Sequence, residues 1–307
     1  MVPQAFTLVA KTFESTDGTP IYCEAVGDPS KPALVFTHGL TCSSMFYDVL
    51  FTNERLLDKC YLIRYDLRGH GRSGKPDTLE AHASGLYADD FLGVLRQFGI
   101  QKCILFGFSF GVTVLTDLCT RHLDDLPVLG CIAVAALPYV GPIMRVVGLP
   151  TIMSMLPGIT CESDVALFLH TKAQFIDSMI AAPEALPYAL RNAWFGQLCA
   201  VPPRVAQRLV SRPQDPQGLF EAGRRGFPLL SITGTHDLHV NGQALVEELQ
   251  PYFKNLDTHV IEGGAHTVYY DHPDEVVDVS LRWLDKILVS PQAVGVAAID
   301  AGPTARS

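Results

Sequence analysis

Positive charge is scarce in this sequence. Its 307 residues include 23 Lys and Arg against 32 Asp and Glu, which gives a formal net charge of -9 at pH 7. Such a chain has no broad basic surface to attract nucleic acid, so we predict no nucleic-acid partner. Hydrophobic residues make up 48% and charged residues only 18%, which argues against general disorder. The length allows one large α/β domain carrying an insertion, or two ordinary domains.

Long hydrophobic runs are absent as well. The nearest candidate, residues 128–144, contains two prolines and two glycines. It is also shorter than the roughly 20 residues that a membrane-spanning helix needs. We therefore predict a buried strand followed by a loop there, and no membrane span. The N-terminal stretch MVPQAFTLVAK lacks the basic flank and long apolar core of a secretory signal, so we expect a cytoplasmic protein.

The cysteines show no metal-ligand pattern. They are spread singly, without a Cys-x-x-Cys pair or a Cys/His ligand spacing, at Cys23, Cys42, Cys60, Cys103, Cys119, Cys131, Cys161 and Cys199. We expect reduced thiols in a cytosolic protein rather than a disulfide framework. No metal and no other cofactor is predicted, and nothing in the sequence predicts an oligomeric state.

Short apolar runs alternate with segments of helical periodicity along most of the chain. The predicted strands are 6–13, 19–26, 33–39, 60–71, 102–111, 131–137, 227–234 and 258–266, and the predicted helices are 86–99, 112–123 and 274–288. This alternation predicts the α/β class, with a mostly parallel central sheet flanked by helices on both faces.

One long stretch departs from this alternation. Residues 138–226 have no clear strand but carry helical patterns, among them 163–182 and 184–200, and we interpret them as an inserted helical cap. The core of the fold is then formed by residues 1–137 and 227–289. Residues 290–307 have no amphipathic pattern and are expected to form a disordered tail.

A serine stands between two glycines where a predicted strand meets a predicted helix. In the stretch Gly107-Phe108-Ser109-Phe110-Gly111, such a sharp turn would project the Ser109 hydroxyl away from the backbone. A serine becomes an effective nucleophile only when a base accepts its proton. The alternative interpretation is an ordinary turn of small residues, but the strand and helix on either side favour a nucleophile.

A base and an acid follow in the order that this turn requires. Asp237 comes just after the strand 227–234, and His266 ends the strand 258–266. The order Ser, Asp, His is that of one class of serine hydrolase and differs from the orders of chymotrypsin and subtilisin. Taken alone, His266 could be a surface-loop residue and Asp237 a helix cap or turn residue. Their agreement with Ser109 predicts a catalytic triad.

Acyl transfer also needs donors for a developing oxyanion. The backbone N–H of Phe110, directly after the nucleophile, is the first candidate. The second is the backbone N–H of Leu40, because Gly39 allows the loop after the strand 33–39 to approach closely.

These motifs together resemble the α/β-hydrolase superfamily. The resemblance covers roughly residues 19–288 and is carried by HGL at 38–40, YDLRGHGRS at 65–73, GFSFG at 107–111, GTHD at 234–237 and GGAH at 263–266. It is nearest to the branch of serine esterases, enol-lactonases and cofactor-free haloperoxidases, and is similar to fungal members. Epoxide hydrolases and haloalkane dehalogenases of this fold carry aspartate at the nucleophile position, so Ser109 implies attack on a carbonyl. Phe108 replaces a histidine often found before the nucleophile.

Other polar residues are assigned structural roles. His38, Asp66, Arg68 and His70 occur in turns typical of the family, where we expect hydrogen bonding. Asp89 and Asp90 are interpreted as a solvated or capping pair on a helix. A metal site at His236, Asp237 and His239 is an alternative that the triad makes unnecessary.

The apolar residues of the insertion predict the substrate. We expect Met144, Phe168, Trp194 and Phe195 to line a largely apolar pocket for a small molecule. The insertion contains no cluster of Arg or Lys, so the sequence does not predict a strongly anionic substrate. The predicted reaction is hydrolysis of an ester, lactone or thioester with an apolar acyl part, through an acyl-enzyme. The same triad could instead serve carbon–carbon bond hydrolysis, acyl transfer or perhydrolysis, or the chain could be a ligand-binding protein on a hydrolase scaffold.

Overall fold

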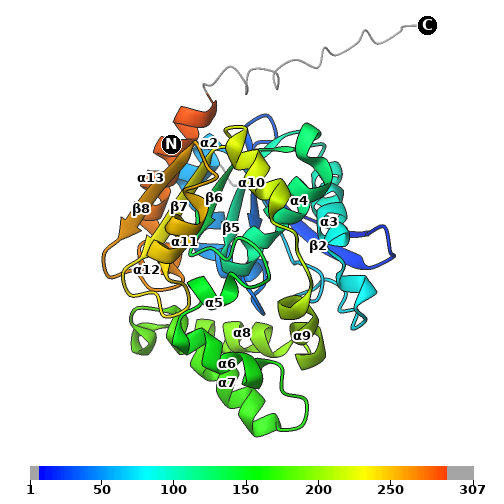
Figure 1. The fold of residues 1–307 in the computed structure, drawn as a ribbon, viewed down its shortest axis with the longest axis vertical. Helices are drawn as coiled ribbons and strands as arrows, with labels where there is room; N and C mark the ends of the chain where they lie inside the picture. The colour runs from blue at the N-terminus through cyan, green and yellow to red at the C-terminus, as the bar shows by residue number, and fades with distance from the viewer. Residues whose placement is uncertain (1–6, 289–307) are drawn as a thin grey trace, which may run out of the picture.

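Eight strands form a single sheet at the centre of the molecule (Figure 1). The computed structural model describes residues 7–288. The order across the sheet is β1-β2-β4-β3-β5-β6-β7-β8. The strands are β1 (Val9–Glu14), β2 (Pro20–Val26), β3 (Ala33–Thr37), β4 (Tyr61–Tyr65), β5 (Cys103–Phe108), β6 (Val128–Val134), β7 (Leu229–Gly234) and β8 (Leu256–Ile261).

Most of the strand pairs are parallel, as predicted. β1 and β2 form an antiparallel hairpin, β2 pairs antiparallel with β4, and every pair from β4 to β8 is parallel. The turn of the hairpin is closed by a hydrogen bond of 2.8 Å from the backbone N–H of Ser15 to the carbonyl of Thr19. Gly18, at φ 80°, supplies the left-handed conformation that this turn needs.

Helices pack on the sheet in two groups. α3 (Ser84–Gln97) and α10 (Gln217–Arg224) pack on either side of α4 (Thr113–His122), while α13 (Pro273–Leu288) packs against α1 (Asp48–Phe51) and α2 (Glu54–Lys59). Parallel strands are joined by right-handed crossovers, which place α3, α4, α10 and α11 (Gly242–Leu249) on one face and α2 on the other. Because both faces are covered, the strands β3, β4 and β5 are buried at every residue.

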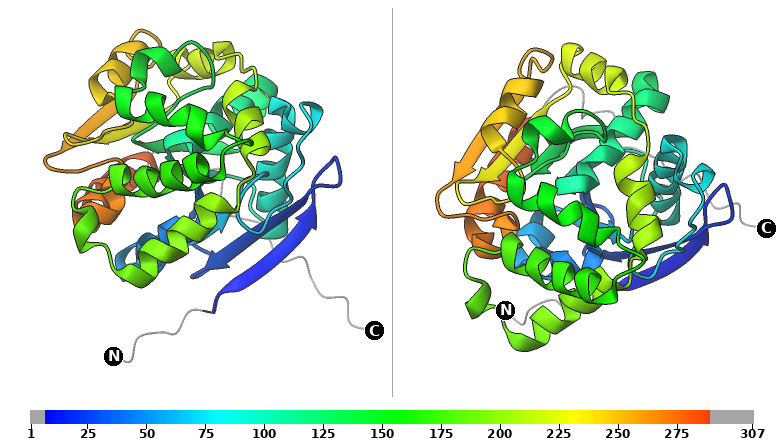
Figure 2. Two further views of the ribbon diagram at one scale, coloured as in Figure 1. Left: turned by 90° about the horizontal axis from the view of Figure 1, so that it is seen from below. Right: turned by 60° about the horizontal axis from the view of Figure 1, so that its bottom comes forward.

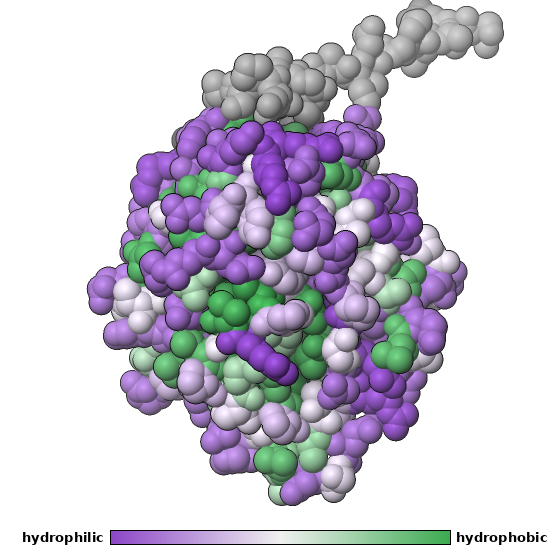
Figure 3. Space-filling model, viewed as in Figure 1, coloured by the Kyte–Doolittle hydropathy of each residue, from purple (hydrophilic) through white to green (hydrophobic). Residues whose placement is uncertain are grey.

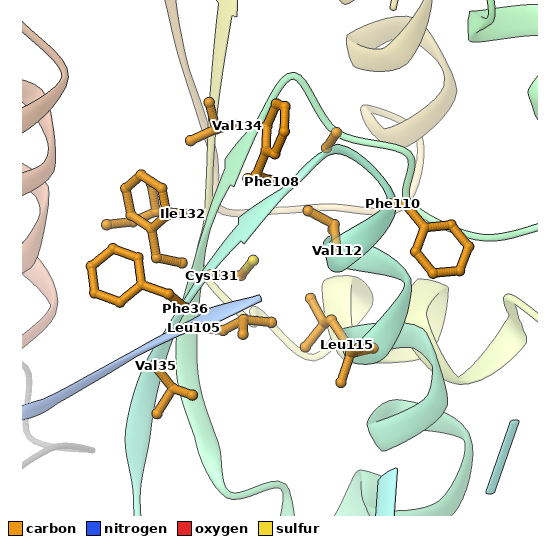
Figure 4. Packing of buried hydrophobic residues seen from close by; sticks show 14 of the residues in the cluster. Val35, Phe36, Leu105, Phe108, Phe110, Val112, Leu115, Cys131, Ile132 and Val134 are labelled. Carbon is orange, nitrogen blue, oxygen red and sulfur yellow. The ribbon is translucent and has the colours of Figure 1, made fainter. Parts of the chain in front are cut away.

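The core consists mainly of side chains from the central strands and the helices on them. In Figure 4, Phe36 of β3 and Ile132 of β6 lie together on one side of the sheet. Leu105 of β5 points to the other side, toward Leu115 of α4. This packing anchors the strand and the helix between which Ser109 lies.

A group of helices lies between β6 and β7 in the chain. The group contains α5 (Met144–Val147), α6 (Pro150–Ile159), α7 (Val165–Met179), α8 (Tyr188–Cys199) and α9 (Pro203–Ser211). Figure 2 shows these helices lying across one end of the sheet. The stretch predicted as the insertion, 138–226, also contains α10, but α10 packs on α4 beside the sheet, away from the other five helices (Figure 1).

Several boundaries differ from the prediction. β6 spans Val128–Val134 rather than 131–137, because the chain turns at Ala135, where φ is 45°, although the apolar sequence continues. The helix α11 was not predicted. The tail predicted for 290–307 lies outside the described residues. All eight cysteines lie within the described residues and are unpaired, six of them buried.

Candidate active site

Ser109 occupies a strained turn between β5 and α4. Its φ is 51°, in the left-handed region that a residue with a side chain seldom adopts. A short 3₁₀ turn, Ser109–Val112, leads from the strand into α4. The turn is possible because Gly111 approaches the backbone of β3. A Cβ on Gly111 would lie 2.0 Å from the carbonyl oxygen of Thr37 and 2.7 Å from that of His38.

We expect the substitution Gly111→Ala to lower the free energy of unfolding by about 1–3 kcal/mol, because backbone atoms cannot move aside as a side chain would. Gly196→Ala on α8 is the matched control, since a Cβ there meets no atom within 4 Å. It should leave stability unchanged or raise it slightly. Urea denaturation of both variants measures the difference, and equal stabilities would contradict the account of the turn.

His266 and Asp237 lie beside Ser109 in a hydrogen-bonded row. The Nε2 of His266 is 3.0 Å from the Ser109 Oγ, and its Nδ1 is 3.0 Å from Asp237 Oδ2 and 3.1 Å from Oδ1. Asp237 Oδ1 also accepts the backbone N–H groups of His239 and Val240, at 2.7 and 3.0 Å. These bonds orient the carboxylate toward Nδ1, which leaves Nε2 free to accept the proton of the Ser109 hydroxyl.

The imidazole of His266 is held by two further rings. Phe108, the residue before the serine, lies 4.9 Å away between ring centroids, and His239 lies 4.3 Å away. Burial, followed by the nearby charge of His266, lowers the pKa of His239 well below its usual value, so His239 is neutral. Its Nε2 is 2.7 Å from the Ser178 Oγ on α7. From the sequence, His239 was a candidate only as an alternative metal ligand, and this contact was not predicted.

The loop after β3 brings Leu40 to the same place. Leu40 and Phe110 line one cavity together with Ser109. A Cβ on Gly39 would lie 2.9 Å from the Phe108 ring, which shows how closely the loop approaches the turn at Ser109. The two predicted donor residues therefore lie at the same cavity as the serine.

Two buried histidines support this loop. His38 Nε2 accepts the backbone N–H of Leu67 at 3.0 Å, and His70 Nε2 accepts that of Thr41 at 3.1 Å. Desolvation by burial lowers the pKa of both histidines, so both are neutral acceptors. Their hydrogen bonds fit the structural role predicted for them.

Arg68 and Asp90 form a buried ion pair. Arg68 donates from Nε to Asp90 Oδ2 at 2.7 Å, and both side chains are buried. The prediction of a solvated or capping pair at Asp89 and Asp90 is wrong for Asp90, because the fold brings the Arg68 turn against its helix. Asp66 accepts the backbone N–H of Ser44 at 2.7 Å and therefore has a structural role.

The cavity at Ser109 is narrow, about 60 Å³, and mostly apolar. Of the four residues predicted to line it, only Met144 does so. Trp194 is instead stacked on Phe46, with ring centroids 4.4 Å apart, and Phe168 and Phe195 lie outside the lining. The lining comes from α5, α6, α7 and the strand ends, and includes Val147, Ile152, Met153, Leu156 and Phe175.

Lys172 is a buried lysine whose position the sequence did not reveal. It lies on α7, and its Nζ has no hydrogen-bond partner among the described residues. Burial lowers its pKa from 10.5 to about 7, while the thiols of Cys199 and Cys42 act weakly in the opposite direction. Between pH 7 and 10.5 the unfolded chain therefore binds a proton that the folded chain does not. Stability consequently falls as the pH is lowered through this window.

Replacing Lys172 by Met is expected to raise the free energy of unfolding at pH 7 by on the order of 2–4 kcal/mol. The gain should shrink as the pH rises from 7 toward 10, because the unfolded lysine then loses its proton as well. Urea denaturation across this pH range measures the gain in stability. The control is Lys254→Met, because Lys254 is exposed. A loss of stability at pH 7 would show that the ammonium group stabilises the fold.

Neither a metal centre nor a spanning helix is found in residues 7–288. No group of three His, Cys, Asp or Glu side chains in this range could hold a metal ion. His239 instead contacts Ser178 and His266, as described above. No helix of the described chain is long and apolar enough to cross a membrane.

Comparisons with known proteins identify the family to which this fold belongs. The family model described as "Alpha/beta hydrolase family" matches residues 34–279. A 2-(acetamidomethylene)succinate hydrolase of Mesorhizobium japonicum is 33% identical over 111 residues, which are 36% of this chain and 38% of the relative. A bifunctional esterase/perhydrolase of Acinetobacter calcoaceticus is 31% identical over 124 residues, 40% of this chain and 43% of the relative. Each match thus spans less than half of the relative's length.

Solved structures match over nearly the whole chain. An esterase from a Rhodococcus species superposes with a TM-score of 0.80 and 26% identity, covering 91% of this chain and 99% of the esterase.

Proposed function

This chain belongs to the alpha/beta hydrolase family, and we propose that it is a serine hydrolase with the catalytic triad Ser109, His266 and Asp237. The observation that carries the proposal is the continuous row of hydrogen bonds from Asp237 through His266 to the Ser109 hydroxyl, at 3.0 Å on each side of the imidazole. Such a row is the arrangement that activates a serine for attack on a carbonyl.

The reaction proceeds through an acyl-enzyme. Ser109 Oγ attacks the carbonyl carbon while His266 Nε2 takes its proton, and the same nitrogen then gives the proton to the leaving group. Water, deprotonated by His266, releases the acyl group in a second attack. Asp237 keeps the proton of the imidazole on Nδ1 and stabilises the imidazolium. The backbone N–H groups of Leu40 and Phe110 stabilise the oxyanion of each tetrahedral intermediate.

The proposed substrate is a carboxylic ester, lactone or thioester. A carbonyl is proposed because members of the fold that attack epoxides carry aspartate where this chain has Ser109. The apolar lining of the narrow cavity favours an acyl part of a few carbons. The relatives named as an esterase/perhydrolase and as an esterase support this class. The first of these names also makes perhydrolysis the second candidate.

We also propose that the protein is cytoplasmic and works on a small molecule. The eight unpaired cysteines favour a reducing compartment.

A panel of p-nitrophenyl esters tests the proposed reaction. With acyl chains from acetate to decanoate, kcat/KM should be highest for chains of roughly two to six carbons and lower for longer chains. All activity should be lost in Ser109→Ala. If every ester is inert while a β-diketone is cleaved, carbon–carbon bond hydrolysis replaces ester hydrolysis. Peroxyacid formation from acetate and hydrogen peroxide would support the second candidate.

A further inference from the structure

A second cavity adjoins the one at Ser109. It lies between α5 and residues 210–214, which include the end of α9 and the chain just after it, and has a volume of about 450 Å³. We call it the outer cavity. It shares four apolar lining residues with the cavity at Ser109, namely Val140, Met144, Met153 and Val210. A ligand whose carbonyl lies at Ser109 can therefore extend past these side chains into the outer cavity.

The outer cavity is basic. Arg145 and Arg212 line it, and no Asp or Glu lines either cavity. Arg145, on α5, is exposed and has no hydrogen bond or ion pair to another side chain in the described part of the chain. Figure 3 shows apolar side chains gathered at the centre of this face, where α5 lies in Figure 1.

Arg212 is the second arginine that lines the outer cavity. It is buried and forms an ion pair of 3.0 Å with Asp117, so its charge is balanced. Its guanidinium carbon lies 5.7 Å from the ring centroid of Phe110, next to the nucleophile. The Nε of Arg212 has no hydrogen-bond partner among the described residues, which leaves a buried donor unsatisfied. The uncompensated charge of the outer cavity therefore belongs to Arg145.

We propose that the outer cavity binds a carboxylate carried by the substrate, and that Arg145 selects this carboxylate. This inference rests on the proposed function. A guanidinium binds a carboxylate through two parallel N–H···O bonds, which fixes its orientation as well as its charge. The four apolar side chains that line both cavities favour a short hydrocarbon segment between the reacting carbonyl and the carboxylate. The substrate class is thus an ester in which a short apolar segment separates the reacting carbonyl from a free carboxylate. Because Arg145 and Arg212 are far apart in the chain, the sequence alone shows no basic cluster.

Two pairs of matched esters test this inference. Mono-p-nitrophenyl adipate and p-nitrophenyl hexanoate differ only in the carboxylate at the end of the acyl chain. The pair 4-acetoxybenzoate and 4-acetoxybenzamide places the charge on the alcohol side instead. We expect the charged member of at least one pair to have a kcat/KM about tenfold higher. Salt should reduce this preference, because part of the interaction is solvent-exposed.

Variants of Arg145 then identify the residue responsible. Arg145→Gln should abolish the preference and Arg145→Glu should reverse it, while the rates of the uncharged esters change less than about twofold. Arg96→Gln removes the same charge from an exposed site on α3 and should keep the preference. Equal rates within both pairs, or a preference that survives in Arg145→Gln, would overturn the inference.

A binding measurement separates this inference from the proposed function. Isothermal titration calorimetry with the Ser109→Ala variant measures the affinity of the same four esters without turnover. The charged member of a pair should bind about tenfold more tightly, and Arg145→Gln in the same background should remove the difference. If all four esters are inert in the wild-type enzyme, ester hydrolysis fails, yet the affinities still decide whether the outer cavity binds a carboxylate. Equal affinities within both pairs would refute the inference.

Discussion

Replacing His266 by Ala should lower kcat by roughly 10⁵- to 10⁶-fold, because Ser109 then has no base within reach. The 3.0 Å contact between His266 Nε2 and the Ser109 Oγ is the only hydrogen bond between the serine hydroxyl and another side chain in residues 7–288. Steady-state hydrolysis of a short p-nitrophenyl ester measures the loss. Substrate affinity should change little, since the imidazole is adjacent to the reacting atoms and contributes little to the walls of the cavity.

His259→Ala is the matched control for this substitution. His259 lies on β8, close in sequence to His266, and its Nε2 contacts Glu275 on the surface at 2.8 Å. Its loss should leave kcat within about twofold of wild type. A His266→Ala enzyme that retains more than a hundredth of the activity would mean that another group accepts the serine proton.

Asp237→Asn should lower kcat by roughly 10³- to 10⁴-fold while the fold stays intact. The side-chain amide oxygen of the asparagine can still accept the two backbone N–H hydrogen bonds that Asp237 Oδ1 accepts, so the loop keeps its shape. It cannot stabilise an imidazolium, and its NH₂ group favours the wrong tautomer of His266. Steady-state kinetics together with the thermal unfolding midpoint separates this effect from a loss of folding.

Asp58→Asn, on the exposed side of α2, is the control for the charge change and should be silent. Near-normal turnover in Asp237→Asn would show that the acid lies elsewhere.

The placement of the proposed triad follows from the topology of the sheet. Leu40, Ser109, Asp237 and His266 come after the carboxyl ends of β3, β5, β7 and β8, and these strands are parallel. Parallel strands end at the same edge, so loops that are far apart in sequence meet there. For this reason, the order of the residues and the predicted strands were enough to predict that Ser109, Asp237 and His266 lie close together.

The residues around the substrate could not be predicted in the same way. Met144, Trp194 and Phe195 are all apolar residues on helices of the insertion, but only Met144 lines the cavity. Trp194 stacks on Phe46, a residue of the core. Hydrophobic periodicity shows that a helix buries one face, but it does not show whether that face packs on protein or borders a cavity.

Contacts between distant segments were missed for a related reason. The contact of His239 with Ser178 on α7 and the joint lining of the outer cavity by Arg145 and Arg212 both depend on how the helices between β6 and β7 lie over the sheet. Lys172 is similar, since its sequence neighbours do not show that the fold buries its side chain completely. These interactions depend on tertiary packing rather than on local sequence, so they were visible only in the fold.

The nucleophile assignment is tested most directly by covalent labelling with a fluorophosphonate probe, followed by intact mass and peptide analysis. The wild-type protein should gain the mass of one probe, located on the peptide that contains Ser109, and Ser109→Ala should gain none. A probe that still attaches to the Ser109→Ala variant at the same rate would contradict the central claim that Ser109 is the nucleophile.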